Sequence, residues 1–286
     1  MIGQQSIQKT LHELIEAQRF PRFSLLIGAK GSGRKTLIQE IQPALQAHKC
    51  VATCYMVPDV KIDTIRAMIT ASYSLMNTLF VIPDADKMSI PAMNATLKIT
   101  EEPPNGNYYI MTVEDESNLL DTIVSRATRF YMDKYTVTDL QMYAHQLTSV
   151  LNQSELMAEV CQTPGDVELL VGCFTEFWDY VNKVFYHVDK VSGANSFKIG
   201  ESLNLQGEKD AQKYDLALFF RAFLVMCSKE MRKTPHEEIP KYIDGIIVTT
   251  RYLQELKTMS VNKQMVFDNW LLALRAKWLQ YADNQA

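Results

Sequence analysis

A glycine-rich segment constrains the fold of this chain more than any other part of its sequence. It reads Gly28-Ala29-Lys30-Gly31-Ser32-Gly33-Arg34-Lys35-Thr36, after an apolar, strand-like run at residues 23–27 and before a helix-like run at residues 36–45. A strand, a glycine-rich turn and a helix in this order are the setting of a phosphate-binding loop, whose backbone N–H groups surround an anion at a helix N-terminus. The segment therefore predicts an α/β domain built around such a loop.

The loop departs from the functional pattern G-x-x-x-x-G-K-[ST] at its two chemically active positions. Arg34 stands where the phosphate-binding lysine belongs, and Lys35 stands where the magnesium-binding hydroxyl belongs. Reading Lys35 and Thr36 as the K-[ST] pair lengthens the loop by one residue and turns both side chains by about 100° around the helix. The alternative that the turn merely closes a strand–helix unit stays open at this point. We expect a vestigial nucleotide site, able at most to retain ATP or an anion, formed by Gly28, Gly31, Gly33, Arg34, Lys35 and Thr36.

Composition indicates a globular protein with more than one domain. A chain of 286 residues suits two or three domains, and 47% hydrophobic with 22% charged residues is ordinary for a globular protein. The net charge of -4 gives no bulk attraction for nucleic acid. The five cysteines are scattered and odd in number, which argues against a disulfide framework, and no metal site is expected at their spacing. Without a signal peptide or an 18-residue apolar stretch, we expect a cytoplasmic protein with no membrane partner.

Hydrophobic periodicity divides the chain into a mixed first part and a helical second part. Up to about residue 133, helix-like segments alternate with strand-like runs at residues 23–27, 51–57, 79–82 and 108–113. This alternation predicts a parallel sheet covered by helices on both faces. Beyond residue 135 only helical periodicity remains, first in short segments and then in long ones at residues 215–232, 239–256 and 262–278. A loop rich in Gly, Asn and Ser is expected at residues 192–207.

The run at residues 79–88 lies where a phosphate-loop ATPase carries the acidic end of a second functional strand. Such a strand ends in two acidic residues, of which the first supports the metal and the second orients the attacking water. Here the first position is Pro83 and the second is Asp84. Because a proline cannot support a cation, we expect no hydrolysis by this chain.

Several segments taken together resemble one protein family. They are residues 79–88 (LFVIPDADKM), 92–104 (AMNATLKITEEPP) and 120–127 (LDTIVSRA), with IGQQ at residues 2–5, Phe20-Pro21 and VNKQMVF at residues 261–267. The series resembles the AAA+ subunits of the bacterial clamp loader, and most closely the delta-prime group of DNA polymerase III. The resemblance covers the first 133 residues well, the next helices moderately and the C-terminal helices weakly.

The resemblance implies a three-domain clamp-loader subunit. It predicts a P-loop NTPase-like AAA+ domain at residues 1–133, a three-helix lid at residues 134–173 and an all-α collar at residues 174–286 that oligomerises. The implied partners are the motor subunits and the delta subunit in a five-subunit ring, with the sliding clamp and primed DNA reached through the complex. In that family the delta-prime subunit is a stator that does not hydrolyse ATP. The chain lacks the cysteine-rich zinc module of many relatives between Lys35 and Val81.

The resemblance assigns the catalytic role in trans to Arg126, with Ser125 of the same motif as the second site residue. In the family this arginine projects into the ATP site of a neighbouring subunit, where a guanidinium stabilises charge on the γ-phosphate. The structural alternative is an arginine that caps a carbonyl or pairs with Asp121 or Glu114. Where active relatives carry a sensor arginine, this chain has Asp166, which would repel a phosphate.

Two other functions remain open for the glycine-rich loop. An active AAA+ ATPase would use Lys35 and Thr36 in a lengthened loop, with Asp84 as the metal carboxylate. A nucleotide-binding module would instead retain nucleotide without hydrolysis, with Arg34 as a static phosphate contact. The neighbouring Glu101 and Glu102 point about 100° apart on a helix, so we expect a helix end before two prolines rather than an acid/base pair.

Overall fold

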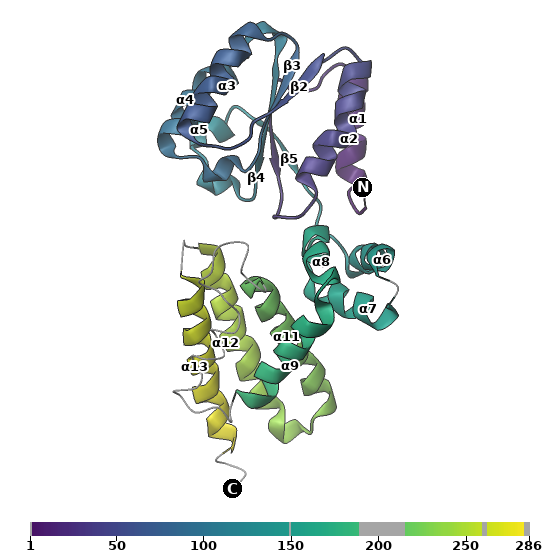
Figure 1. Cartoon of the computed structure of the whole chain (residues 1–286), viewed down its shortest axis with the longest axis vertical. Coiled ribbons are helices and arrows are strands. Elements are labelled where there is room, and N and C mark those ends of the chain that lie inside the picture. Colours follow the sequence, from purple (N-terminus) through teal and green to yellow (C-terminus); the bar gives the residue numbers. More distant parts are fainter. Residues whose placement is uncertain (1, 149, 189–214, 259–261, 283–286) are drawn as a thin grey trace. The chain divides into compact units, whose positions relative to one another are not determined.

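The computed structural model describes residues 2–148, 150–188, 215–258 and 262–282 (Figure 1). These residues form two compact units, of which the first comprises residues up to 139 together with residues 163–165. The second comprises residues 140–162 and the described residues from 166 onward. The loop predicted at residues 192–207 lies outside the described residues, and the division into three domains stays a prediction.

The first unit is built on a five-stranded parallel sheet, which confirms the α/β prediction. The strands pair in the order β2 (Thr53–Met56), β3 (Thr78–Ile82), β4 (Tyr108–Val113), β1 (Phe23–Ile27) and β5 (Thr128–Tyr131). Strands β1, β3 and β4 are buried along their whole length. Because β1 lies between β4 and β5, the loop that follows β1 emerges among the C-terminal ends of the strands, where open α/β sheets bind ligands.

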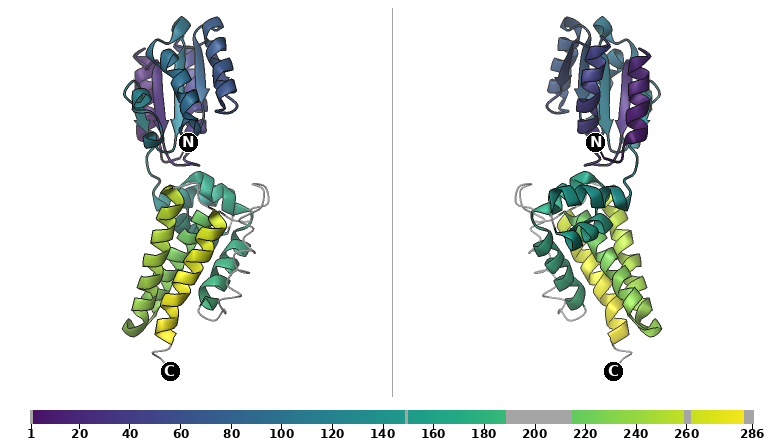
Figure 2. Two further views of the ribbon diagram at one scale, coloured as in Figure 1. Left: turned by 90° about the vertical axis from the view of Figure 1, so that its left-hand side faces the viewer. Right: turned by 90° about the vertical axis from the view of Figure 1, so that its right-hand side faces the viewer.

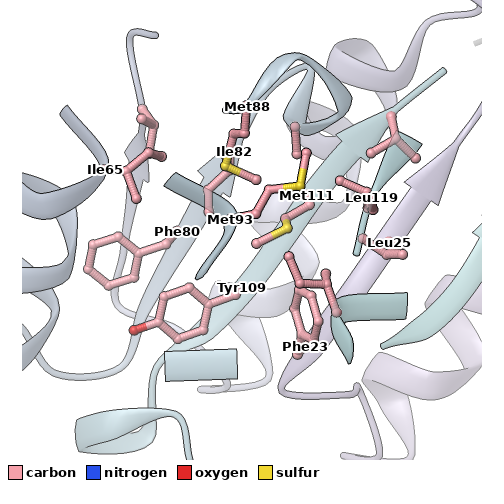
Figure 3. Close-up of a cluster of buried hydrophobic side chains, with 14 of the residues drawn as sticks. Phe23, Leu25, Ile65, Phe80, Ile82, Met88, Met93, Tyr109, Met111 and Leu119 are labelled. Carbon is pink, nitrogen blue, oxygen red and sulfur yellow. The ribbon is translucent and has the colours of Figure 1, made fainter. Parts of the chain in front are cut away.

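Helices cover both faces of this sheet (Figures 1 and 2). One face carries α1 (Gln5–Glu16) and α2 (Arg34–Ala47). The other carries α3 (Ile62–Ser74), α4 (Ile90–Glu101) and the short α5 (Asp121–Val124). Buried strand residues alternate between the two faces, so β3 gives Phe80 and Ile82 to one apolar cluster and Leu79 and Val81 to the other. Figure 3 shows the first cluster, in which the ring centroids of Phe80 and Tyr109 lie 5.2 Å apart.

Strand β5 was not among the predicted strands. It has four residues at the edge of the sheet, and three of them are exposed. Its register pairs Ser24 with Thr128 and Ile27 with Tyr131. A strand this short and this exposed carries no apolar alternation from which the sequence could predict it.

The described part of the second unit is helical, as predicted. Three short helices, α6 (Val137–Leu147), α7 (Leu151–Val160) and α8 (Pro164–Val171), precede α9 (Phe174–His187). Three long helices, α11 (Leu216–Lys233), α12 (Ile239–Thr258) and α13 (Lys263–Ala282), pack side by side (Figure 2). No helix in the described ranges is long and apolar enough to cross a bilayer.

Aromatic side chains fill the core of the second unit. Trp270 is fully buried, its ring centroid lies 4.9 Å from that of Phe223, and its Nε1 donates a 3.0 Å hydrogen bond to the Thr249 hydroxyl. The aromatic residues of α9 join this core through Phe185, whose ring lies 5.1 Å from that of Phe223. Burying such rings against each other stabilises the unit well beyond their contact area alone.

The cysteines are thiols, and none forms a disulfide. Burial raises the pKa of both Cys161 and Cys227 to about 12. Thiols held in the neutral form by an apolar environment are packing groups rather than nucleophiles or metal ligands. In the described ranges, no group of three or more His, Cys, Asp or Glu side chains is placed to hold a metal ion.

Candidate functional site

The glycine-rich loop has the backbone shape of a phosphate-binding turn. It begins after β1, where the Gly28 N–H donates to the Val113 carbonyl at 3.0 Å, and it ends at the start of α2. Gly31 and Gly33 adopt positive φ angles of 78° and 84°. Residues with a side chain rarely adopt such angles, so the turn depends on glycine at both positions. The predicted strand, glycine turn and helix are therefore confirmed.

The Arg34 side chain is committed to a partner inside the protein. Only 8% of Arg34 is exposed, and its Nη2 lies 3.1 Å from Oδ1 of Asp84, just beyond β3. The second Asp84 oxygen accepts from Lys87 at 3.0 Å. In a working ATPase the residue at the Arg34 position would contact phosphate, and the residue at the Asp84 position would orient water. Here the charges of the two side chains neutralise each other.

Lys35 and Thr36 occupy a different environment from Arg34. Both residues are exposed on the first turn of α2, whereas Arg34 turns into the protein. The lengthened loop of an active ATPase would need these two side chains to face the phosphates. Arg34, which stands at the lysine position of the sequence pattern, is buried instead.

Contacts with other segments of the first unit hold the loop in shape. The Gly165 N–H donates to the Gly31 carbonyl at 3.1 Å, and the Tyr135 hydroxyl donates to the Ser32 carbonyl at 2.8 Å. A Cβ atom on Gly28 would lie 2.5 Å from Cγ of Met132. Protein contacts therefore help to hold this turn in shape.

Pro83 lies where the sequence places it, and Asp166 is held by polar partners inside the protein. Pro83 directly follows β3, as the sequence predicts. Oδ2 of Asp166 lies 2.9 Å from Nη1 of Arg221 and also accepts from the Gln162 N–H at 2.9 Å. Both side chains of the Asp166–Arg221 pair are about as buried as each other, at 15% and 14% exposed. The pair joins α8 to α11 inside the second unit.

Arg126 lies just after α5 and is held by two groups. Its Nε lies 3.1 Å from Oε1 of Glu101, the last residue of α4, and its Nη2 donates to the same oxygen. Its Nη1 donates to the Thr122 carbonyl, which the Ser125 hydroxyl also contacts at 3.4 Å. Arg126 therefore caps a carbonyl, as the structural alternative predicts, but its acidic partner is Glu101 and not Asp121 or Glu114.

The sequence does not predict the pairing of Arg126 with Glu101. It does predict a helix end at Glu101, and α4 ends there. Twenty-five positions separate the two residues, so no local pattern links them. The one sequence signal for this pair is that oppositely charged residues stand at or just after the ends of two helices, α4 and α5.

The loop and Arg126 lie at opposite ends of the parallel strands. Arg126 precedes β5, whereas the loop follows β1, and β5 runs parallel to β1 in the register that sets Ser24 beside Thr128. The four residues of β5 alone separate these two ends by about 13 Å, at roughly 3.3 Å per residue. Arg126 is therefore remote from the loop of its own chain.

Comparisons with known proteins point to replication machinery. A family model described as "DNA polymerase III, delta subunit" matches residues 56–136, a span that contains Asp84, Glu101 and Arg126. The chain is 24% identical to the DNA polymerase III subunit tau of Bacillus subtilis over 196 residues, which are 59% of this chain and 34% of tau. It is 30% identical to the Escherichia coli subunit tau over 81 residues, which are 28% of this chain and 12% of tau. The chain thus spans well under two thirds of these relatives.

A solved structure supports the fold. A RuvB protein of Thermotoga maritima, carrying a single substitution, matches with a TM-score of 0.52 and 18% identity, over 98% of this chain and 88% of RuvB. At that identity the match shows an AAA+ fold and nothing further. The family model and the tau relatives agree in their similarity to clamp-loader subunits of DNA polymerase III, and the fold is that of an AAA+ protein.

Proposed function

We propose that this chain is the non-hydrolysing, delta-prime-like stator of a replicative clamp loader. In this proposal it supplies Arg126 to the ATP site of a neighbouring subunit while a sliding clamp is loaded onto primed DNA. The carrying observation is the position of Arg126 at the strand ends opposite its own loop. An arginine placed there can act on a nucleotide only when another subunit brings that nucleotide to it.

The state of the chain's own loop supports the absence of hydrolysis. The Arg34–Asp84 pair occupies the lysine position and the water-orienting position at once, and Pro83 takes the place of the metal-supporting carboxylate. Phosphoryl transfer depends on a metal ion and on positioned charges around the γ-phosphate. Without those groups the loop serves as a structural turn.

The proposed partners follow from the family. The tau relatives are named as subunits of DNA polymerase III, which supports assembly with motor subunits and a delta subunit in a five-subunit ring. Sliding clamp and primed DNA would be contacted through that complex, in the cytoplasm. The net charge of -4 fits a subunit that shares its DNA contacts with others rather than binding DNA alone.

One observation favours a second candidate, in which the loop retains a nucleotide or anion without hydrolysing it. Two buried polar atoms at the loop, Oγ of Ser32 and Nη1 of Arg34, have no hydrogen-bond partner in the described part of the chain. A buried polar atom without a partner is costly. An anion that reached both atoms beside the N-terminus of α2 would satisfy them.

Titration of the purified chain with labelled ATP, combined with an assay of phosphate release, separates these functions. The proposal predicts no phosphate release above a protein-free blank, because the chain lacks the metal-supporting carboxylate. Saturable binding without release would support the second candidate. Catalytic release that disappears on Lys35→Ala substitution would establish an active ATPase and contradict the proposal.

A further inference from the structure

We propose that Glu101 is a positioning residue that holds Arg126 ready for the phosphate of a neighbouring nucleotide. This inference rests on the proposed action of Arg126 in trans. It assigns a role to a residue at the end of α4 that neither the sequence motif nor the family match identifies. The contacts of the Arg126 guanidinium, its backbone support and its remaining donors carry the argument.

The guanidinium binds Glu101 through one edge of its planar donor set and the Thr122 carbonyl through Nη1. Arginine carries five N–H donors in a rigid fork. Nε and Nη2 each donate to Oε1 of Glu101, and Nη1 donates to the Thr122 carbonyl, so three donors are used. The other two, one on Nη1 and one on Nη2, have no partner among the residues that the structure describes. Because Nη1 and Nη2 each keep one donor, the group can still donate to phosphate oxygens through both of its terminal nitrogens.

The backbone on both sides of this contact is fixed by the apolar core. Ile123 in α5 and Ile99 in α4 are fully buried and belong to the same cluster, which includes the residues shown in Figure 3. Glu101 therefore starts from one anchored helix end, and the Thr122 carbonyl belongs to the other. A guanidinium held between two anchored groups loses less side-chain freedom when it meets a phosphate.

The contacts leave Arg126 accessible to a phosphate rather than blocking it. The Arg126 side chain is 32% exposed, and Glu101 binds its Nε side rather than its terminal fork. A carboxylate that blocked the fork would compete directly with phosphate oxygens. Glu101 leaves the fork available and fixes the direction in which it points.

A double-mutant cycle in the reconstituted clamp-loader complex tests this role. The variants are Glu101→Ala, Arg126→Ala and both together, and the readouts are kcat and KM for ATP hydrolysis stimulated by primed DNA. We expect Glu101→Ala to lower kcat by about 3-fold or more with little change in KM, a coupling at the low end of the range for contacting residues. In the Arg126→Ala background the same substitution should change nothing further. Glu101→Gln, which retains an acceptor oxygen, should restore much of the lost turnover.

Glu102→Ala is the matched control, because Glu102 is an adjacent exposed glutamate whose carboxylate has no partner among the described residues. It removes the same charge and should leave turnover unchanged. Thermal unfolding of each variant chain checks that it folds. If Glu101→Ala does not fold, Glu101→Met, which keeps most of the side-chain length without an acceptor oxygen, carries the test and should lower kcat in the same way.

The outcomes distinguish a failure of the proposed function from a failure of the positioning role of Glu101. If Arg126→Ala leaves turnover unchanged, the proposed function fails. If Arg126→Ala lowers turnover but Glu101→Ala does not, or if the two losses simply multiply, the positioning role is overturned. A rise in turnover on Glu101→Ala would show that Glu101 restrains Arg126, which also contradicts the proposal.

Discussion

Two glycines fix the loop through a contact that leaves no room for a side chain. A Cβ atom on Gly31 would lie 2.7 Å from the Thr163 hydroxyl and 3.0 Å from Cα of Gly165. A Cβ atom on Gly165 would lie 2.6 Å from Cα of Gly31. The sequence explains Gly31 by the turn alone, but the close approach of two backbones adds a second reason that only the three-dimensional structure reveals.

Gly31→Ala is expected to destabilise the chain by about 1–3 kcal/mol, because it combines an unfavourable positive φ with a backbone clash. The free energy of unfolding from urea titration measures the change. Gly172→Ala is the matched control, since no atom lies within 4 Å of its added Cβ, and it should stay within about 0.5 kcal/mol of the wild type. Equal stability of the two variants would contradict the close contact at Gly31.

At the scale of elements, hydrophobic periodicity predicted the helices and strands whose own residues are regularly buried. The buried strands β1, β3 and β4 and the long helices carry strong periodicity, and the structure confirms them. Strand β5 lacks such a pattern, and the contacts Arg34–Asp84 and Arg126–Glu101 join elements far apart in the chain. Those contacts depend on how the elements pack against each other. Residue types and their spacing along the chain do not reveal that packing. The motif therefore identified Arg126 and Arg34 but not their partners.

The Arg34–Asp84 pair joins α2 to the end of β3. Removing only the carboxylate should destabilise the chain more than replacing both partners. Asp84→Asn leaves the buried Arg34 charge without its carboxylate, and we expect a loss of about 1–2 kcal/mol, less than for a fully buried pair because the Asp84 side chain is 43% exposed. Asparagine tolerates the positive φ of 47° at this position.

The double variant Arg34→Met with Asp84→Asn should recover part of that loss, because methionine fills the space without an unpaired charge. Urea unfolding of the three variant chains measures both effects. The single variants are Asp84→Asn and Arg34→Met. If the double variant loses more stability than the two single variants lose together, the view that the pair mainly neutralises a buried charge is contradicted.

At the scale of the whole molecule, the chain has the parts of an ATP site but does not combine them. Its loop lies at the C-terminal ends of the strands and is locked by Asp84, whereas Arg126 lies at the opposite ends with two donors that have no partner among the described residues. Under the proposed function, a neighbouring subunit brings the nucleotide on which Arg126 acts.

The most direct test of this account compares Arg126→Ala with Arg129→Ala in the reconstituted clamp-loader complex. Arg129 is a nearby arginine on β5 whose side chain is 50% exposed and pairs only loosely with Glu116, at 3.7 Å. The measurement is ATP turnover in the presence of sliding clamp and primed DNA. An arginine acting in trans contributes on the order of 10³-fold or more at the site it serves, so Arg126→Ala should abolish that site's share of turnover while Arg129→Ala leaves the total unchanged. Equal turnover of the two variants and the wild type would contradict the account.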